Sequence, residues 1–351
     1  MDDQHKTEPR LTSLSHGGGC GCKIAPGVLA GLLRGTAMLP VPDALLVGIE
    51  TSDDAAVYQL NDRQALVATT DFFMPIVDDP LDFGRIAATN AISDVYAMGG
   101  TPIMALSLVG MPINILSGET IARILEGGAM ACREAGIPIG GGHTIDSVEA
   151  IYGLVALGLV DPAHVKRNSG ARPGDVLILG KPLGVGVMSA ALKKGALSDE
   201  GYRAMIAATT KLNTPGPDLA RLAGVHAMTD VTGFGLAGHA LEMARGSGCE
   251  LRLDWPAVPL LAGVRDLAAG GFVTGASGRN WTSYGGDVVL SEGFADLDRA
   301  LLTDPQTSGG LLVACAEDQA DAALAIFAKH GFAEAVVIGR AVAGPGRIVI
   351  D

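Results

Sequence analysis

Residues 82–100 have the sequence DFGRIAATNAISDVYAMGG, which predicts a helix from Phe83 to Met98. The apolar residues recur at helical spacing and form one stripe, which consists of Ile86, Ala87, Ala91, Ile92, Val95 and Met98. Two glycines follow, as is common after the last turn of a helix. Asn90 and Asp94 are four residues apart, so they share a face of this helix.

Strands and helices mix without strict alternation on both sides of this helix. Strands are expected at Leu45–Ile49, Ala55–Leu60, Ala65–Thr70, Ile103–Val109, Ile137–Ile139, Ile151–Val160, Val176–Leu179, His226–Thr229, Glu250–Leu253, Leu311–Ala314, Ala335–Ile338 and Arg347–Ile350. Helices are expected at Pro26–Leu33, Thr120–Ala135, Gly186–Leu192, Glu200–Leu212, Pro217–Leu222, Leu236–Ala244 and Asp318–Lys329. This mixture predicts an α/β (α+β) fold.

The length of 351 residues suits two domains of ordinary size. Residues 161–175, DPAHVKRNSGARPGD, are polar and rich in turn formers, so the domain junction is expected near them. We therefore expect a flexible, Gly/Cys-rich N-terminal segment at 1–42, an N-terminal domain at 43–162 and a C-terminal domain at 163–351.

The formal net charge of −13 makes nucleic acid and anionic membranes improbable partners. Five cysteines, an odd number without framework spacing, indicate a reducing compartment rather than a disulfide scaffold. The polar N-terminus lacks the apolar core of a signal peptide, so a cytoplasmic protein is expected. The charge-free run at 101–118 is broken by prolines and is interpreted as a strand plus a loop, not as a membrane span.

A glycine-rich segment, SHGGGCGCK at residues 15–23, contains two cysteines and a lysine. His16 and Lys23 would both favour the thiolate form of Cys20, which is the reactive form. The other interpretation is a tail with two incidental cysteines, and these residues alone do not decide between the two. A zinc site at Cys20 and Cys22 has little support, because the chain has no second cysteine pair.

Several aspartates are expected at strand ends or on a polar helix face: Asp53, Asp54, Asp71, Asp94 and Asp230. Gathered carboxylates repel one another unless a cation joins them, and Mg²⁺ is commonly held by carboxylates together with substrate phosphates. Each aspartate taken alone is better explained as a turn or cap residue. The five together favour a metal–phosphate site.

Two glycine-rich segments are candidate phosphate contacts. Gly140–Thr144 is expected to follow a strand, where its amides could cradle phosphate or simply form a tight turn. Gly233–Gly238 matches the dinucleotide pattern, but the short strand before it ends in Asp230. A structural turn or a metal-assisted phosphate contact is therefore favoured there over a nicotinamide site. Core or structural roles are expected for Cys132, Cys249, His143, His226 and His239.

Seven motifs are spread over nearly the whole chain: SHGGGCGCK at 15–23, DDAAV at 53–57, TTDFFMPIV at 69–77, DFGRIAATNAISDVYAMGG at 82–100, GGHTID at 141–146, MTDVTGFGLAGH at 228–239 and DPQTSGGLL at 304–312. In these motifs the chain resembles the selenophosphate synthetase (selenide, water dikinase) family. The resemblance implies a fold like that of aminoimidazole ribonucleotide synthetase and a homodimer built through the N-terminal domain. It also implies synthesis of selenophosphate from ATP, selenide and water, with release of AMP and phosphate.

The resemblance further implies roles for individual residues. Cys20 and Lys23 would be catalytic, and Asp54, Asp94 and Asp230 would hold Mg²⁺. The implied ATP contacts are Lys23, Thr51, Ser52, Asp53, Asp71, Asp94, Gly142, His143 and Thr144. A selenium-delivery protein is a possible further partner.

Two other functions remain as alternatives at this point. The chain could be a different ATP-dependent member of the same fold group, such as a cyclo-ligase or a small-molecule kinase, although the Cys20/Lys23 segment argues against this. It could instead be a non-catalytic selenium or metal carrier. The aspartates argue against a carrier, because a soft cargo does not favour hard oxygen ligands.

Overall fold

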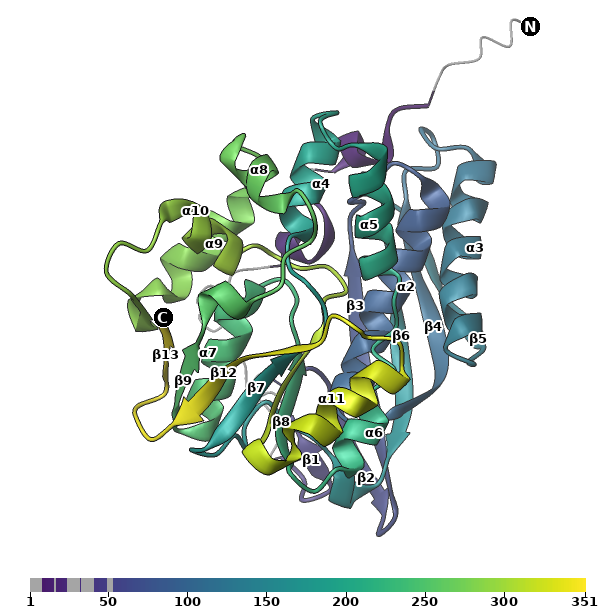
Figure 1. The fold of residues 1–351 in the computed structure, drawn as a ribbon. Helices are drawn as coiled ribbons and strands as arrows, with labels where there is room; N and C mark the ends of the chain where they lie inside the picture. Colours follow the sequence, from purple (N-terminus) through teal and green to yellow (C-terminus); the bar gives the residue numbers. More distant parts are fainter. Residues whose placement is uncertain (1–7, 16, 24–31, 33–40, 49–52) are drawn as a thin grey trace, which may run out of the picture.

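Two mixed sheets, one in each half of the chain, organise the computed structural model, which describes residues 8–15, 17–23, 32, 41–48 and 53–351 (Figure 1). The strand order is β1-β2-β3-β6-β4-β5 in the first sheet and β10-β13-β9-β12-β7-β11-β8 in the second. Parallel and antiparallel pairs occur in both sheets. The predicted α/β (α+β) class is confirmed.

The N-terminal half forms the first sheet and two long helices. Its elements are β1 (Leu45–Val47), β2 (Ala56–Asn61), β3 (Gln64–Phe73), α2 (Pro80–Ala97), β4 (Thr101–Met111), α3 (Gly118–Glu134), β5 (Ile139–Asp146) and β6 (Ile151–Val160). β6 is central and pairs antiparallel with both β3 and β4, whereas β5 pairs parallel with β4 at the sheet edge. This order places β5 three strands away from β3.

The C-terminal half forms the second sheet and the remaining helices. Its strands are β7 (Asp175–Leu179), β8 (Val225–Asp230), β9 (Glu250–Leu253), β10 (Val288–Leu290), β11 (Leu311–Ala316), β12 (Val336–Val342) and β13 (Arg347–Ile350). Its helices are α4 (Val185–Lys193), α5 (Asp199–Thr209), α6 (Gly216–Arg221), α7 (Gly235–Ser247), α8 (Val264–Ala269), α9 (Gly275–Tyr284), α10 (Asp296–Leu302) and α11 (Ala320–Lys329), with short 3-10 turns η3 (Pro162–His164), η4 (Trp255–Ala257), η5 (Gly285–Asp287) and η6 (Glu317–Gln319).

Helix α2 is buried on most of its faces because it contacts the first sheet, α3 and the second half of the chain. It begins with Pro80 after Asp79, whose side chain caps the first turn by accepting from the amide of Asp82. Gly99 follows its end with φ +78°, which glycine adopts without strain. α2 and α3 pack closely, since a Cβ on Gly84 would lie 1.9 Å from the carbonyl oxygen of Ile124.

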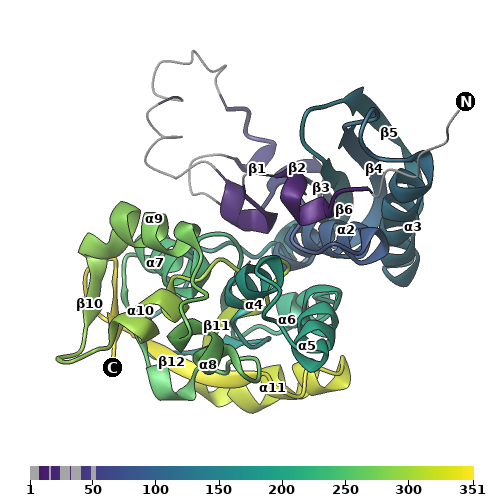
Figure 2. The same cartoon turned by 90° about the horizontal axis from the view of Figure 1, so that it is seen from above.

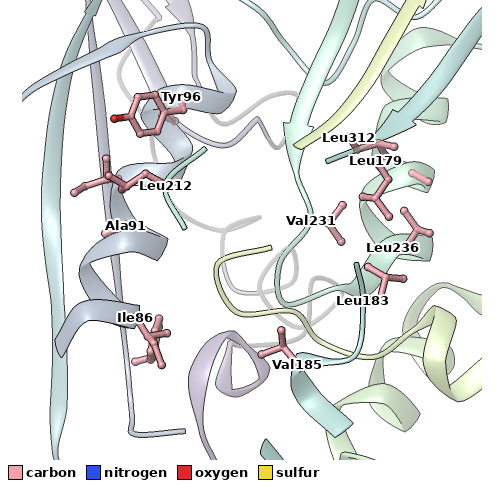
Figure 3. Close-up of a cluster of buried hydrophobic side chains, with 14 of the residues drawn as sticks. Ile86, Ala91, Tyr96, Leu179, Leu183, Val185, Leu212, Val231, Leu236 and Leu312 are labelled. Atoms are coloured by element: carbon pink, nitrogen blue, oxygen red, sulfur yellow. The ribbon is translucent and has the colours of Figure 1, made fainter. Parts of the chain in front are cut away.

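One apolar cluster crosses from the first half to the second (Figure 3). Ile86, Ala91 and Tyr96 extend from α2, and Val231 and Leu312 come from the C-terminal half. Viewed from above, the two halves form two lobes, with the N-terminal segment where they meet (Figure 2). The polar side chains of the site described below lie at this same junction.

The N-terminal segment carries two short 3-10 helices, η1 (Leu11–Leu14) and η2 (Gly19–Cys22). Asp78 accepts hydrogen bonds from Arg10 Nε at 2.7 Å and from Thr12 Oγ1 at 2.6 Å, which ties η1 to the first half. The carbonyl oxygen of Gly21 accepts from Arg279 Nη2 at 3.0 Å, which ties η2 to the second half. We call residues 8–23 the arm.

Several expected elements differ from those observed. Asp71 lies inside β3 and not after its end, and Gly140–Thr144 is strand β5 and not a loop. Residues 254–310, where no element was expected, form η4, η5, β10 and three short helices whose small and polar residues give weak periodicity. The helix expected at Pro26–Leu33 lies almost wholly outside the described residues, and the flexibility of the N-terminal segment stays a prediction.

The charge-free run at 101–118 forms β4 and the turn after it, as expected. Within the part of the chain that the structure describes, no helix combines the length and the apolar character needed to cross a bilayer. Cys132 and Cys249 are buried, which confirms their expected place in the core.

Candidate functional site

Four aspartates from both halves of the chain lie around the junction between the lobes. Asp54 lies just before β2, Asp71 on β3, Asp94 on α2 and Asp230 at the end of β8. Neighbouring side chains hold their oxygens: Thr229 Oγ1 donates to Asp54 at 2.8 Å, Thr69 Oγ1 to Asp94 at 2.6 Å and Ser93 Oγ to Asp230 at 2.5 Å. The fold thus gathers carboxylates that the sequence separates by up to 176 positions, from Asp54 to Asp230.

These carboxylates act on one another electrostatically. Burial, together with the charges of Asp230 and Asp94, raises the pKa of Asp54 well above its usual value. Burial and the charges of Asp230 and Asp71 do the same to the pKa of Asp94. Burial raises the pKa of Asp230 to about 6, although the bond from Ser93 and the charge of Lys23 oppose this. A cation among these groups would relieve both the repulsion and the loss of solvation.

The donor set suits a hard cation such as Mg²⁺, which prefers carboxylate oxygens. Oδ2 of Asp54 is buried and has no hydrogen-bond partner among the described residues, so one acceptor is left for such an ion. As placed, however, the described side chains contain no group of three or more His, Cys, Asp or Glu that could hold a metal ion. The residue types fit a hard cation, although their present positions do not form a metal-binding group.

A continuous chain of hydrogen bonds links Lys23 of the arm to the interior of the C-terminal half. Lys23 Nζ lies 3.2 Å from Asp71 Oδ2, and Asn90 Nδ2 donates to the same oxygen at 2.5 Å. Asn90 Oδ1 accepts from the amide of Ser308 at 2.7 Å, and the carbonyl oxygen of Ser308 accepts from Lys181 Nζ at 2.8 Å. Asn90 thereby joins the two halves of the chain.

Ser308 and Lys181 are both under physical constraint in this chain. Ser308 has φ +53°, the only positive φ of a non-glycine residue in the described part of the molecule. Burial lowers the pKa of Lys181 to about 7, while the charge of Asp230 acts in the opposite direction. A strained backbone or a buried charged group persists only where surrounding contacts stabilise it. Here the bond from Lys181 and the bond to Asn90 hold the backbone of Ser308 in place.

The arm presents Lys23 to the carboxylates, whereas the side chain of Cys20 lies outside the described residues. The backbone of Cys20 belongs to η2, whose Gly19 amide donates to the carbonyl oxygen of Met74 at 2.9 Å. Cys22 is a partly buried free thiol that donates to the carbonyl oxygen of Gly19 at 2.7 Å. Burial raises its pKa, which keeps this second cysteine protonated.

The expected nucleotide contacts do not all converge in one chain. Asp53 accepts from the amide of Asn168 at 2.7 Å, near the junction. Thr51 and Ser52 lie outside the described residues. Gly142, His143 and Thr144 are exposed on the edge strand β5. With strands about 4.8 Å apart, they lie roughly 14 Å across the sheet from β3.

The glycine pattern at 233–238 forms the turn before α7 and the first residues of that helix. Gly235 has φ +70° and packs against the backbone of Thr303, where a Cβ would lie 2.7 Å from the carbonyl carbon. Burial lowers the pKa of His239 to about 3, so this side chain is a neutral core histidine. Neither observation points to a nicotinamide site, and a structural turn accounts for the pattern.

Sequence reasoning missed several polar residues that complete the site: Ser93, Asn213, Lys181 and Ser308. Asn213 Nδ2 donates both to Ser93 Oγ at 2.8 Å and to the carbonyl oxygen of Gly309 at 2.9 Å. Ser93 lies in the motif at 82–100 and Ser308 in the motif at 304–312, so the motifs contained the signal. Lys181 and Asn213 stand outside those motifs, and only their contacts identify them.

The fold and the site together define a class. Residues 52–160 match the family model described as AIR synthase related protein, N-terminal domain, and residues 172–351 match that of the C-terminal domain. The chain is therefore a two-domain protein of the AIR synthase related class.

The comparison of whole sequences is more specific. Selenide, water dikinase of Burkholderia pseudomallei is 68% identical over 98% of this chain and 97% of its own length. The enzyme of the same name from Rhizobium meliloti is 59% identical over 97% of this chain and 98% of its own length. The chain belongs to the selenide, water dikinase family.

Solved structures of low sequence identity share the fold. Thiamine-monophosphate kinase from Stenotrophomonas maltophilia has a TM-score of 0.64 at 22% identity, over 93% of this chain and 94% of that one. Hydrogenase maturation protein HypE in complex with ATP has a TM-score of 0.61 at 20% identity, over 86% and 85%. At this level of identity the likeness describes the architecture alone.

Proposed function

We infer that this protein is a selenide, water dikinase, which makes selenophosphate from ATP, selenide and water and releases AMP and phosphate. The observation that carries this is the identity of 59–68% with enzymes of that name over nearly the full length of each chain. Its product would serve the formation of selenocysteine or selenouridine. The reaction is a phosphoryl transfer, which depends mostly on positioning and on stabilisation of charge.

We propose that the carboxylates at the junction form the centre of the active site. Asp54, Asp94 and Asp230 would hold Mg²⁺, which would neutralise phosphate charge when bound. The unpartnered oxygen of Asp54 and the mutually raised pKa values support this assignment. Asp71 and Asn90 would orient Lys23, whose ammonium group approaches Asp71 from the arm.

The arm has the chemistry for handling selenium. Glycine at three successive positions before Cys20 allows the backbone to pass close to its neighbours: a Cβ on Gly19 would lie 2.3 Å from Thr307 Oγ1. In our proposal Cys20 receives or orients selenium while Lys23 faces the phosphates. A covering arm would also exclude water from an oxidisable nucleophile.

The edge strand β5 supports the proposal of a homodimer. Exposed apolar side chains gather on and near this edge, namely Ile113, Ile115, Ile145 and Val148. An exposed strand edge with apolar residues favours pairing with another chain. In such a dimer Gly142, His143 and Thr144 of one subunit would contact the nucleotide bound by the other subunit. They could then contribute to ATP binding although they are distant from Asp71 in their own subunit.

Cytoplasmic location and a selenium-delivery partner are also proposals. The cysteines whose side chains are described are all free thiols, which fits a reducing compartment. The charge of −13 disfavours nucleic acid and anionic membranes as partners.

Product analysis tests the inferred reaction directly. The purified protein, incubated anaerobically with ATP, Mg²⁺ and selenide, should form selenophosphate by ³¹P NMR, with AMP and one equivalent of phosphate. ADP as the final nucleotide would instead indicate a kinase of the same fold group, and no ATP turnover would indicate a carrier.

Two variants test the residue assignments. Full selenophosphate output from Cys20→Ser would eliminate Cys20 as essential, and an unchanged Mg²⁺ requirement in Asp54→Asn would remove Asp54 from the site.

A further inference from the structure

A hollow of about 280 Å³ lies beside the arm, at the boundary with the C-terminal half. Its walls include Gly18 and Gly21, which bracket the cysteine at position 20, together with residues from the starts of α4 and α9. This volume is slightly below the roughly 300–1,000 Å³ of pockets that hold drug-sized ligands. We call it the arm hollow, and its size suits a ligand of few atoms.

The charge of the arm hollow is opposite to that of the protein as a whole. Among the described residues, Lys193 and Arg279 line it and no aspartate or glutamate does, although the chain carries a net charge of −13. Lys193 Nζ donates to the carbonyl oxygen of Ser15 at 3.3 Å, and Arg279 Nη2 to that of Gly21. Both cations are therefore held at the two ends of the glycine-rich segment, where a small anion would meet them.

The nearby carboxylate of Asp304 adds little negative charge to this surface. Its Oδ2 accepts from the amides of Gly186 and Val187 at 3.0 and 3.2 Å, beneath the wall of the hollow. Burial raises the pKa of Asp304 to about 7, so the group is partly neutral near physiological pH.

The remaining walls distinguish between kinds of anion. Ile76, Val185, Ala276 and Pro305 contribute apolar surface. Apolar walls disfavour a strongly hydrated anion such as phosphate, because its lost hydration is not replaced there. They suit a large, polarisable and weakly hydrated anion, and selenide in neutral water is such a species, the hydrogen selenide monoanion.

We propose that the arm hollow takes up selenium substrate as the hydrogen selenide anion and delivers it to the arm segment that carries Cys20. The proposal rests on the function inferred above and adds the place and the charge state in which selenium arrives. No bond forms or breaks at this step. Lys193 and Arg279 attract the anion, and the apolar walls select it over phosphate.

The test is the Michaelis constant for selenide in charge variants of the full-length protein. Lys193→Gln keeps an N–H donor for Ser15 but removes the charge, and Arg279→Gln does the same for Gly21. Each should raise the KM for selenide about fivefold, as expected for one charge a few ångströms away in a half-open site, with the KM for ATP unchanged. The double variant should show a larger rise in the KM for selenide. Lys193→Arg keeps the charge and should retain the wild-type KM.

The neighbouring lysine provides a matched control. Lys194 follows α4 and does not line the hollow, so Lys194→Gln changes the net charge equally and should leave the KM for selenide unchanged. Iodide, a soft anion, should compete with selenide in the wild type and compete less well in the double variant.

An unchanged KM for selenide in the double variant would overturn the proposal. The proposal would also be overturned if the double variant showed weaker product inhibition by phosphate but an unchanged KM for selenide. The hollow would then be an exit for phosphate. Absence of selenophosphate formation by the wild type would refute the proposed function itself, so the two failures are distinguishable.

Discussion

Removal of the Ser93 hydroxyl should move the pH dependence of activity, because that hydroxyl stabilises the ionised form of Asp230. Ser93 Oγ donates to Asp230 Oδ2 at 2.5 Å, and both residues are buried. Ser93→Ala deletes this donor and almost no volume. Asn213 Nδ2 keeps its other acceptor, the carbonyl oxygen of Gly309.

The size of the effect follows from the bond that is lost. A hydrogen bond to a charged group contributes about 1.5–3 kcal/mol. Since one pKa unit corresponds to about 1.4 kcal/mol, the pKa of Asp230 should rise by about 1–2 units from its value of about 6. At pH 7 the ionised fraction would fall from about nine-tenths to between about one-half and one-tenth. The Mg²⁺ concentration required for half-maximal activity should rise about two- to tenfold.

The assay is selenophosphate formation at several Mg²⁺ concentrations between pH 6 and pH 9. The acidic limb of the Ser93→Ala profile should move upward by about 1–2 units, and activity should approach the wild-type value at pH 9. Thr89 is one turn earlier on α2 and its buried hydroxyl has no hydrogen-bond partner among the described residues, so Thr89→Val is the matched control and should not move the profile. A uniform loss of activity at every pH, with no shift, would refute the reasoning.

Three further outcomes are expected. The raised pKa of Asp230 means that the metal-free native state binds an extra proton between about pH 4 and pH 6. The stability of the wild type should therefore fall by about 2 kcal/mol relative to Asp230→Asn as the pH rises from about 4.5 to about 7. Urea unfolding at pH 4.5 and pH 7 measures this, and parallel pH dependences would contradict it. Gly84→Ala should cost about 1–3 kcal/mol in urea unfolding, because its Cβ would strike the Ile124 carbonyl, whereas Gly118→Ala, whose Cβ meets nothing within 4 Å, should cost nothing. Asp78→Ala removes the acceptor of Arg10 and Thr12 and should speed hydrogen exchange at residues 11–14; exchange at the wild-type rate would show that other contacts hold the arm.

The mixed fold followed from local patterns wherever those patterns were strong. The apolar stripe at 83–98 and the apolar run at 151–160 correspond closely to α2 and β6. Local patterns failed where the residues are small or where two assignments compete. Glycines at 140–142 indicated a loop, yet pairing of β5 with β4 overrides that preference because the strand supplies partners for their backbone groups.

The sequence by itself determined which chemistry is present: a cysteine and a lysine on a glycine-rich segment, and aspartates of the kind that suit a hard cation. Only the tertiary structure decided which of these groups meet. It brings Asp54, Asp94 and Asp230 within electrostatic reach of one another and leaves His143 on a distant sheet edge. It also recruits Asn213, whose bond to Ser93 joins the two halves of the chain, and Lys181, which binds the carbonyl oxygen of Ser308 within the C-terminal half. The physical reason is that spacing along the chain dictates neighbours only within one helix or strand, whereas packing of α2 between two sheets sets the distances across the junction.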